Sequence, residues 1–341
     1  MKILTLIIPA YNSTAYLDKC VSSMLAPEVL EKLEIIIVND GSTDTTEEIA
    51  QEFCGRYPGT VRLISQENRG HGGALNTGCD AARGKYLKVV DADDWVETGS
   101  LPEFVALLER CNSDVVLTHH HTVDIGTGEV KNWKSYPETF GKCYSFGEVM
   151  SNWKCFDRSL TFHGITYRTA FYQENGIRLS EQVFYEDHEF ATFPCCRAEG
   201  VTCLDLFIYN YRVGDANQSV SDANQLRRIG HIEAVIRRMT EEYRKLPDDD
   251  GKRYAAMKLQ GLLLSYLTTA LLSDPDRKEG RRLARQIMAA CGSDAPEVYG
   301  MVKGKYAVFS VMNRLHIRKQ TWNRILGSRL YNRLRKKQSF E

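Results

Sequence analysis

Short apolar runs alternate with amphipathic stretches along the first 120 residues of the chain. The runs are rich in Val, Ile and Leu and nearly unbroken by polar side chains, which is typical of strands buried on both faces of a parallel sheet. They lie at residues 3–8, 34–39, 61–64, 86–90 and 114–119. Residues 16–25 place apolar side chains at helical spacing, and a second helix is expected to begin near Ser42–Asp44. We expect Ser13 or Thr14 to cap the first helix.

Repeated strand–helix units predict an α/β fold with an open, mostly parallel sheet and right-handed crossovers. From residue 121 to 215 the alternation stops, and aromatic and polar residues mix, so irregular α+β structure is expected there. From about residue 222 the pattern becomes helical. The apolar stretch at 261–272 is shorter than the ~20 residues of a membrane span, so no membrane-spanning helix is expected.

Polar residues cluster directly after three of the predicted strands. The sequence PAYN (9–12) follows the first strand, DGSTD (40–44) the second and DADD (91–94) the fourth. Ligands of open α/β sheets bind at the carboxyl ends of the strands, and those ends share one edge of the sheet. The three clusters therefore predict one common site.

The chemistry of these clusters is ambiguous when each is taken alone. Carboxylates in a D-x-D pattern at a strand end suit Mg²⁺ or Mn²⁺, although an acidic turn that caps the next helix is an equal alternative. Between the second and third clusters, residues 68–87 contain several glycines and Arg69, which suit close approach to a phosphate. This segment matches neither GxGxxG nor GxxxxGK[ST], which argues against dinucleotide binding and P-loop hydrolysis.

Charge is distributed unevenly along the 341 residues. Formal net charge is zero, yet eleven of the 44 Lys and Arg residues lie in 301–341, together with a single acid, Glu341. Within 314–337 the pattern predicts a basic amphipathic helix, which could lie on an anionic membrane or pack on the core. Its apolar positions are Trp322, Ile325, Leu326, Leu330 and Leu334. The acidic body and the absence of a recognition module disfavour nucleic acid as a partner.

Cysteine usage and the N-terminus indicate the compartment. None of the ten cysteines forms a CxxC pair, as expected of reduced thiols in the cytoplasm. The N-terminal apolar run is interrupted by Pro9 and resembles a first strand rather than a signal peptide. We therefore expect a cytoplasmic protein that associates peripherally with the inner face of the membrane if the tail binds lipid.

In their order and spacing, three motifs closely resemble those of the family-2 glycosyltransferases of the GT-A fold. They are IIPAYN, IIIVNDGSTD and ENRGHGGALNTGCDAARGKYLKVVDADDW. The resemblance is strongest over residues 3–120 and weaker over 160–212. It implies a nucleotide-sugar donor, usually a UDP-sugar, with Mn²⁺ or Mg²⁺ as cofactor and inversion at the anomeric carbon. Residues 1–120 would then bind the donor, 121–215 would bind the acceptor and carry the base, and 216–341 would form a helical extension.

The resemblance also implies roles for individual donor-site residues. Tyr11 and Asp40 would hold the base of the nucleotide, and Arg69 would lie near the diphosphate. Asp91 would contact the ribose or the metal, and Asp93 would be a metal ligand. The remaining expected nucleotide-sugar contacts are Pro9, Asn12, Ser42, Gly70, Asn76 and Ala92.

An inverting transferase also needs a base for the acceptor hydroxyl. The sequence YEDHEF (185–190) resembles the later Glu-Asp motif of the family, so Asp187 is the expected base, with Glu186 as its neighbour and alternate. Acids at a helix N-terminus are the alternative interpretation. Acceptor or sugar contacts are expected from His163, Asp94, Tyr185 and Arg212, although a buried His and a structural Arg ion pair explain His163 and Arg212 equally well.

The favoured hypothesis is an inverting, metal-dependent glycosyltransferase that acts on a glycan or lipid-linked acceptor in bacterial surface polysaccharide synthesis. A sugar-nucleotide pyrophosphorylase is one alternative, but residues 9–17 lack the glycine-rich basic loop expected after its first strand. A protein that binds sugar nucleotides without turnover is the other alternative.

Overall fold

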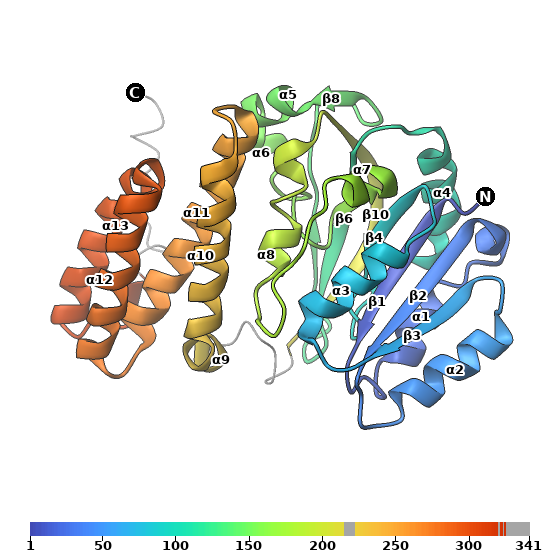
Figure 1. Ribbon diagram of the computed structural model, residues 1–341, viewed down its shortest axis with the longest axis horizontal. Coiled ribbons are helices and arrows are strands. Elements are labelled where there is room, and N and C mark those ends of the chain that lie inside the picture. Colours follow the sequence, from blue (N-terminus) through green and yellow to red (C-terminus); the bar gives the residue numbers. More distant parts are fainter. Residues whose placement is uncertain (215–221, 320, 323, 325–341) are drawn as a thin grey trace. The chain divides into compact units, whose positions relative to one another are not determined.

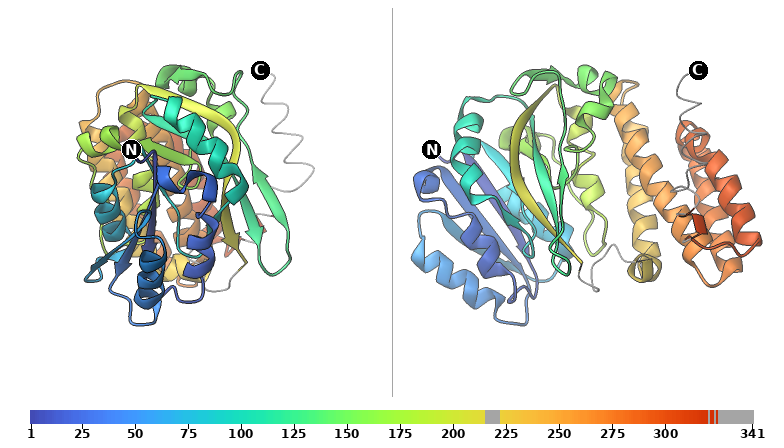
Figure 2. Two further views of the ribbon diagram at one scale, coloured as in Figure 1. Left: turned by 90° about the vertical axis from the view of Figure 1, so that its right-hand side faces the viewer. Right: turned by 180° about the vertical axis from the view of Figure 1, so that it is seen from behind.

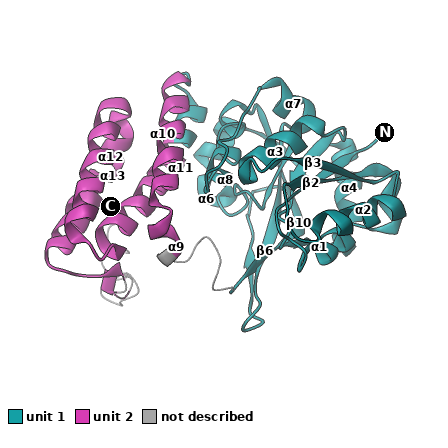
Figure 3. Cartoon of the chain, turned by 60° about the horizontal axis from the view of Figure 1, so that its bottom comes forward, with its two compact units in different colours: residues 1–218, 246–255 teal, residues 219–245, 256–341 magenta. Residues whose placement is uncertain are grey.

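The computed structural model describes residues 1–214, 222–319, 321–322 and 324 of the chain. The chain forms two compact units, shown in Figure 3. The first comprises Met1–Gln218 and Leu246–Ala255, and the second comprises Ser219–Lys245 and Ala256–Glu341. The predicted boundary at residue 120 falls inside the first unit.

Four parallel strands form the N-terminal half of the sheet in the first unit (Figure 1). They pair in the order β3-β2-β1-β4 and are β1 (Leu4–Ala10), β2 (Leu33–Asp40), β3 (Val61–Gln66) and β4 (Tyr86–Val89). Every side chain of β1 and β2 is buried, as the unbroken apolar pattern predicted.

The other half of the sheet is mixed. Strand β9 (Ile165–Arg168) lies between β4 and β6 (Val115–Asp124) and runs antiparallel to both. Strand β10 (Gly200–Val213) pairs parallel with β6. The other antiparallel strands are β5 (Trp95–Val96) and β8 (Cys143–Ser145) on β10, and β7 (Val130–Trp133) on β6. The α/β fold class is thus confirmed, with the parallel pairing concentrated in the first 90 residues.

Helices cover both faces of this sheet (Figure 2). On one face, the core joins β1 side chains to α1 (Leu17–Ser23), α2 (Thr46–Arg56) and α4 (Leu101–Arg110). On the other face, α3 (Gly70–Ala81) packs so closely that a Cβ on Gly78 would lie 2.3 Å from Ile7 Cγ2. The remaining helices of this unit are η1 (Pro27–Lys32), η2 (Thr98–Ser100), α5 (Phe146–Ser151), α6 (Trp153–Phe156), α7 (Thr169–Glu174), α8 (Asp187–Phe190) and η3 (Cys195–Arg197).

The helix-start predictions were partly wrong. No side chain caps α1, because Ser13 accepts hydrogen bonds from the N–H groups of Tyr16 and Leu17 through its backbone carbonyl instead. Helix α2 begins at Thr46, slightly later than predicted, and Asp44 Oδ1 accepts from the Thr46 N–H at 3.1 Å. This local hydrogen bonding lowers the pKa of Asp44 to about 2, despite the opposing effect of burial.

The second unit is helical, as predicted. It contains α9 (Asp222–Arg227), α10 (Ile229–Lys245), most of α11 (Asp250–Thr268), a π-helical turn η4 (Thr269–Ser273), α12 (Arg277–Asp294) and α13 (Pro296–Arg314). Within the unit, Tyr243 donates to Glu297 at 2.7 Å, and Tyr266 donates to Glu233 at 3.1 Å.

Two sequence predictions about membranes concern this region. The helix over Asp250–Ser273 is long and apolar enough to cross a membrane, but 61% of its most apolar window is buried, as in the core helix of a globular protein. The absence of a membrane span therefore stays a prediction. Trp322, in the predicted basic tail, makes an edge-to-face contact with Phe309, with ring centroids 5.3 Å apart. Ile325, Leu326, Leu330 and Leu334 lie outside the described residues.

Candidate active site

The carboxyl ends of β1, β2 and β4 bring the three polar clusters to one edge of the sheet, as predicted; we call it the carboxyl edge. Asn12, just after β1, adopts a positive φ of 49°. Its Oδ1 accepts from the Thr43 N–H at 2.8 Å, and its own N–H donates to Ser42 Oγ at 3.0 Å. These bonds tie the ends of β1 and β2 together. Tyr11 beside them is 52% exposed, so its ring is accessible to a ligand.

Asp40 ends β2 and is buried. Its Oδ1 accepts from Gln66 Nε2 at 2.7 Å and from the backbone N–H of Arg69 at 2.9 Å. Thr77 Oγ1 in turn donates to the Gln66 side-chain oxygen at 2.6 Å. Asp40 therefore fixes the start of α3 as well as standing at the carboxyl edge.

The acid cluster after β4 is tightly packed. The carboxylates of Asp91, Asp93 and Asp94 each place an oxygen within 4.8 Å of the others. Asp94 is buried, and its two oxygens accept from the Tyr209 hydroxyl at 2.5 Å and the Arg212 N–H at 2.7 Å. Asp94 thus holds β10 against the cluster, while Asp91 and Asp93 are only partly buried.

Crowding makes ionisation of this cluster costly. Burial and then the charge of Asp91 raise the pKa of Asp93. Burial, followed by the charges of Asp91 and Asp93, raises the pKa of Asp94 well above its usual value. Like charges held this close favour the protonated form unless a cation compensates them. The cluster therefore offers carboxylate oxygens, the ligands that hard divalent cations prefer, and a cation there would offset the repulsion between the carboxylates.

His71, which the sequence analysis did not select, bridges the acid cluster to the predicted base motif. Its Nε2 lies 2.9 Å from Asp91 Oδ1, and its Nδ1 lies 2.5 Å from Glu186 Oε1. Burial alone would lower the pKa of His71, but the two carboxylates raise it well above its usual value. The other Glu186 oxygen is buried without a hydrogen-bond partner among the described residues. His71 is thus the main partner of Glu186.

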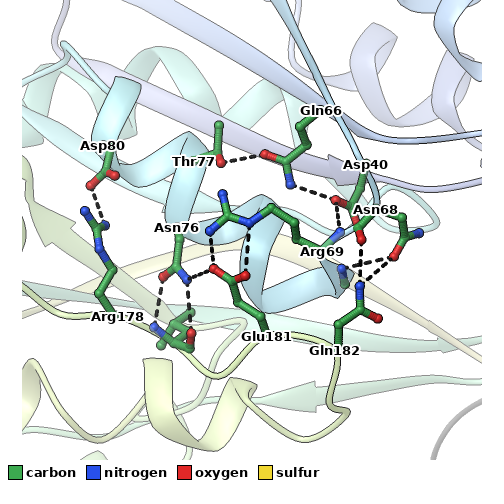
Figure 4. A network of polar contacts seen from close by, with 12 residues as sticks. Asp40, Gln66, Asn68, Arg69, Asn76, Thr77, Asp80, Arg178, Glu181 and Gln182 are labelled. Carbon is green, nitrogen blue, oxygen red and sulfur yellow. Dashed lines mark hydrogen bonds and ion pairs between the residues drawn. The ribbon is translucent and has the colours of Figure 1, made fainter.

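The start of α3 interlocks with residues 179–186, which lead into α8 (Figure 4). Arg69 forms an ion pair with Glu181 through Nε at 2.9 Å and through Nη2. The Gln182 N–H donates to the Arg69 carbonyl at 3.0 Å. Asn76 both donates to and accepts from the backbone of Leu179, at 3.0 and 2.9 Å. Segments more than 100 residues apart in sequence are therefore joined at the carboxyl edge.

Two glycines make this close contact sterically feasible. Gly70 has a φ of 76°, and a Cβ there would lie 2.9 Å from the Gln182 nitrogen. A Cβ on Gly72 would lie 2.1 Å from the Ser180 carbonyl oxygen and 3.1 Å from Glu186 Cγ. Backbone atoms are the obstacle in each case, so a side chain would displace the segment rather than a flexible group.

We predict that Gly72→Ala lowers turnover by at least about tenfold and destabilises the protein by about 1–3 kcal/mol, because the added methyl pushes 179–186 away from α3. Gly55→Ala is the matched control, since a Cβ at Gly55 meets no atom within 4 Å. Thermal unfolding and steady-state kinetics of both variants measure the two effects. Equal activity of Gly72→Ala and wild type would show that the interlock does not matter for turnover.

Replacing His71 by Ala should lower kcat by about ten- to a hundredfold, the range typical of losing a side chain that orients the carboxylates of a site. Loss of the imidazole leaves buried Glu186 without its partner and removes the hydrogen bond to Asp91. His71→Asn and His71→Gln each preserve one of the two contacts and should recover part of the loss. A purely structural role would instead lower thermal stability in all three variants and leave kcat per folded molecule unchanged.

Asp187 is the first residue of α8 and is half-buried, directly after Glu186. Its charge acts on His163 and Tyr211, whose rings stack with centroids 4.3 Å apart. Burial lowers the pKa of His163 to about 4, although Asp91 and Asp187 oppose this. The charges of Asp91 and Asp187 both act on His163. Tyr185, directly before Glu186, has a positive φ of 77°.

Three predicted residues have intramolecular contacts that bear on their expected roles. The Arg69 guanidinium is paired with Glu181 through Nε and Nη2. Asn76 is buried in the interlock described above. The Arg212 guanidinium lies 4.4 Å from the centroid of the Tyr16 ring, beside the acid cluster. The ligand roles of these residues stay predictions.

Lys88 is a second residue that sequence reasoning missed. It is fully buried in β4, and its Nζ donates to the carbonyls of His163 at 2.7 Å and Ile165 at 3.2 Å. Burial lowers its pKa to about 7. Lys88 thereby fixes the backbone that carries His163. The only signal in the sequence was a charged residue within an apolar strand pattern.

Comparisons with known proteins agree with this geometry. The sequence model of the family described as "Glycosyl transferase family 2" matches residues 5–169. The uncharacterized glycosyltransferase EpsJ of Bacillus subtilis is 28% identical over 249 residues, which cover 71% of this chain and 67% of EpsJ. Alignments with three further bacterial glycosyltransferases cover only 18%, 30% and 42% of those proteins.

Solved structures show the same fold. Residues 1–349 of S. aureus TarS in complex with UDP-GlcNAc superpose with a TM-score of 0.67 and 19% identity, over 92% of this chain and 89% of that one. The mannosyltransferase PcManGT from Pyrobaculum calidifontis, in complex with GDP-Man and Mn²⁺, gives a TM-score of 0.51 at 18% identity, over 91% and 84% of the two chains.

These matches favour the transferase hypothesis over a pyrophosphorylase or a binding protein without turnover. The matched segment contains the three strand-end clusters and His71, and it ends just after β9. Residues 5–169 belong to glycosyl transferase family 2, and the chain is a glycosyltransferase with the GT-A fold.

Proposed function

We propose that the enzyme transfers a sugar from a UDP-sugar to a hydroxyl of a glycan or lipid-linked acceptor, with inversion at the anomeric carbon and with Mn²⁺ or Mg²⁺ as cofactor. The observation that carries this proposal is the His71 bridge. It joins the acid cluster at the carboxyl edge to Glu186, directly before Asp187. A donor diphosphate and an acceptor hydroxyl could thus meet between two sets of acids.

The residues present fit a divalent cation. Both carboxylate oxygens of Asp94 already accept hydrogen bonds, from Tyr209 and from the Arg212 N–H. Asp91 and Asp93 are therefore the carboxylates that would hold the ion. Asp91 Oδ1 is oriented by His71, an arrangement typical of the outer shell of metal ligands. The Mn²⁺ named with PcManGT supports the choice of cation. The ion, when bound, supplies Lewis-acid stabilisation of the leaving diphosphate.

The donor proposal rests on the carboxyl edge and on a related structure. Tyr11 is exposed there, the Asn12 N–H donates to Ser42 Oγ, and Asp40 accepts from the Arg69 N–H. TarS was solved with UDP-GlcNAc, which supports a UDP-sugar as donor. We assign Tyr11 and Asp40 to the nucleotide base and Arg69 to the diphosphate.

The acceptor hydroxyl would be deprotonated by Asp187 as its oxygen attacks the anomeric carbon. The bond from that carbon to the diphosphate oxygen breaks on the opposite face, and the nucleoside diphosphate leaves with the electron pair. We assign His163, which stacks on Tyr211, to contact with the sugar or the acceptor. Glu186 is engaged by His71, which leaves Asp187 as the freer of the two acids.

The biological setting is also part of the proposal. We assign the enzyme to synthesis of a bacterial surface polysaccharide, in the cytoplasm at the inner face of the membrane. Nine of the eleven basic residues of 301–341 lie within the tail, 314–337, and support its contact with anionic lipid. A lipid-linked acceptor would lie at the same surface.

A donor screen tests the proposal. Release of nucleoside diphosphate is measured with a panel of UDP- and GDP-sugars, with Mn²⁺, Mg²⁺ or EDTA, and with a mixed pool of glycan acceptors. We expect nucleoside diphosphate to be released from a UDP-sugar in the presence of Mn²⁺ or Mg²⁺. We expect EDTA to abolish this release. Turnover that is unaffected by EDTA would contradict the metal, and turnover only with GDP-sugars would contradict the donor. Product analysis by NMR establishes whether the anomeric configuration is inverted.

A further inference from the structure

The outward face of α13 is apolar along most of its length. Its large exposed side chains are Met301, Val308, Val311 and Leu315, with exposed fractions of 41%, 46%, 53% and 65%. Their spacing of seven, three and four residues puts them on one side of the helix. Gly300, Gly304 and Ala307, also exposed, fall on the same side. The opposite side, with Val302, Phe309 and Met312, is buried in the second unit.

Basic residues flank this apolar face, and the only acid of α13 is Glu297 in its first turn, which accepts a hydrogen bond from Tyr243 at 2.7 Å. Lys303, Lys305, Arg314 and Arg318 are all exposed. The sequence contains no Asp or Glu between residues 298 and 340. An apolar strip bordered by Lys and Arg is the pattern of a helix that lies in the headgroup region of an anionic bilayer.

A cationic pocket adjoins the C-terminal end of the strip. It has a volume of about 620 Å³ and is lined by Pro275, Asp276, Arg277, Lys278, Arg281, Arg314 and His316. Asp276, its only acid, accepts the N–H groups of Lys278 and Glu279 at the start of α12, so its carboxylate is already engaged. Among the described residues, the four Lys and Arg side chains of the pocket form no ion pair.

The pocket is held in shape by a buried polar side chain. Asn313 is fully buried, and its Nδ2 donates to the Leu271 carbonyl at 2.8 Å. Its Oδ1 accepts from Arg281 Nη1 at 2.5 Å, while Arg277 Nη1 donates to the same Leu271 carbonyl at 2.7 Å. Two of the guanidinium groups are thus positioned before any ligand arrives.

We propose that the apolar face of α13 and this pocket form a membrane-docking surface, with the face in the interfacial region and the pocket on the phosphates of anionic lipids. The surface lies in residues 275–318, upstream of most of the tail, and it deepens the membrane contact included in the proposed function. The positive charge of the surface favours anionic lipid as the binding partner. A second copy stacked on the same face would bring two sets of Lys303, Lys305 and Arg314 together, which repel each other.

Vesicle co-sedimentation of the full chain tests the proposal. Vesicles of phosphatidylcholine alone are compared with vesicles that also contain phosphatidylglycerol. The variants are Val311→Ser/Leu315→Ser for the face and Lys278→Gln/Arg314→Gln for the pocket. We expect binding to anionic vesicles to fall about tenfold or more for the face variant, and about fivefold for each charge removed from the pocket.

Controls separate this surface from other causes. Val130→Ser/Lys131→Gln alters the same kinds of exposed residue on β7 of the first unit and should bind vesicles like wild type. Arg333→Gln/Arg335→Gln removes charge from the tail alone. Wild-type binding by both the face and the pocket variant would overturn the proposal. A lipid-free dimer that the face variant abolishes, with vesicle binding intact, would assign the face to self-association.

Nucleotide release by the same variants distinguishes this inference from the proposed function. With a soluble acceptor, the face and pocket variants should turn over like wild type, because their substitutions lie outside the acid cluster and the base motif. If wild type binds anionic vesicles but releases no nucleotide from any sugar donor, the proposed donor chemistry fails while the docking surface stands.

Discussion

Asp93→Asn should lower the rate of nucleoside diphosphate release by at least about a hundredfold, because it removes the charge of a proposed cation ligand while preserving side-chain volume. Asp93 is the partly buried member of the acid cluster that no described side chain engages by a hydrogen bond or ion pair. Asp94, by contrast, is occupied by Tyr209 and Arg212. Steady-state kinetics over a range of Mn²⁺ concentrations should show a weaker apparent affinity for the metal.

Asp18→Asn is the matched control for charge, since Asp18 is an exposed acid on α1. It should retain wild-type turnover and wild-type dependence on Mn²⁺. Calorimetric titration of Mn²⁺ in the presence of UDP provides a second readout that does not depend on turnover. An Asp93→Asn enzyme that binds Mn²⁺ and UDP as wild type does would remove Asp93 from the metal site.

Asp187→Asn should lower kcat by about 10²- to 10⁴-fold with little change in the KM for the donor, the range expected for loss of a general base. The amide preserves the size of the side chain at the start of α8 but cannot accept the acceptor's proton. Donor binding, measured by titration of UDP, should stay at the wild-type level because the acid cluster is untouched.

Glu186→Gln separates the two adjacent acids. Glu186 is bound to His71 and buried, so its amide variant should disturb the bridge and cost less activity than Asp187→Asn. The circular dichroism spectrum and melting temperature of each variant show whether the fold is retained. If Asp187→Asn keeps wild-type activity, Asp187 is not the base, and an inactive Glu186→Gln then makes Glu186 the next candidate.

The N-terminal half of the sheet could be predicted from sequence because its information is local. Buried parallel strands appear as unbroken apolar runs, and their carboxyl ends share an edge, so Asp40 and the cluster at 91–94 were placed correctly relative to the sheet. The caps were less predictable. Ser13 and Thr14 fit the residue preferences of an N-cap, but the backbone carbonyl of Ser13 served instead.

The interlock between α3 and residues 179–186 could not be predicted in this way. His71 and Glu186 are 115 residues apart, and no periodicity connects them. The glycines of the segment 68–87 suggested a backbone close to a ligand, whereas Gly70 and Gly72 prove to accommodate another part of the chain. The glycines correctly indicated that the backbone is closely approached, but they did not indicate that the approaching group is another segment of the chain. Lys88 was overlooked because one polar residue does not break an apolar strand pattern.

The position of β9 has a consequence for dissecting this enzyme. This four-residue strand is supplied by residues 165–168, yet it fills the gap between β4 and β6, which come from the first 124 residues. A fragment that ends near residue 120 would leave two unpaired strand borders facing each other, which invites intermolecular pairing and aggregation. Chimeras between related enzymes should therefore take their crossover points downstream of β9 and carry β1 to β4 and β9 from one parent.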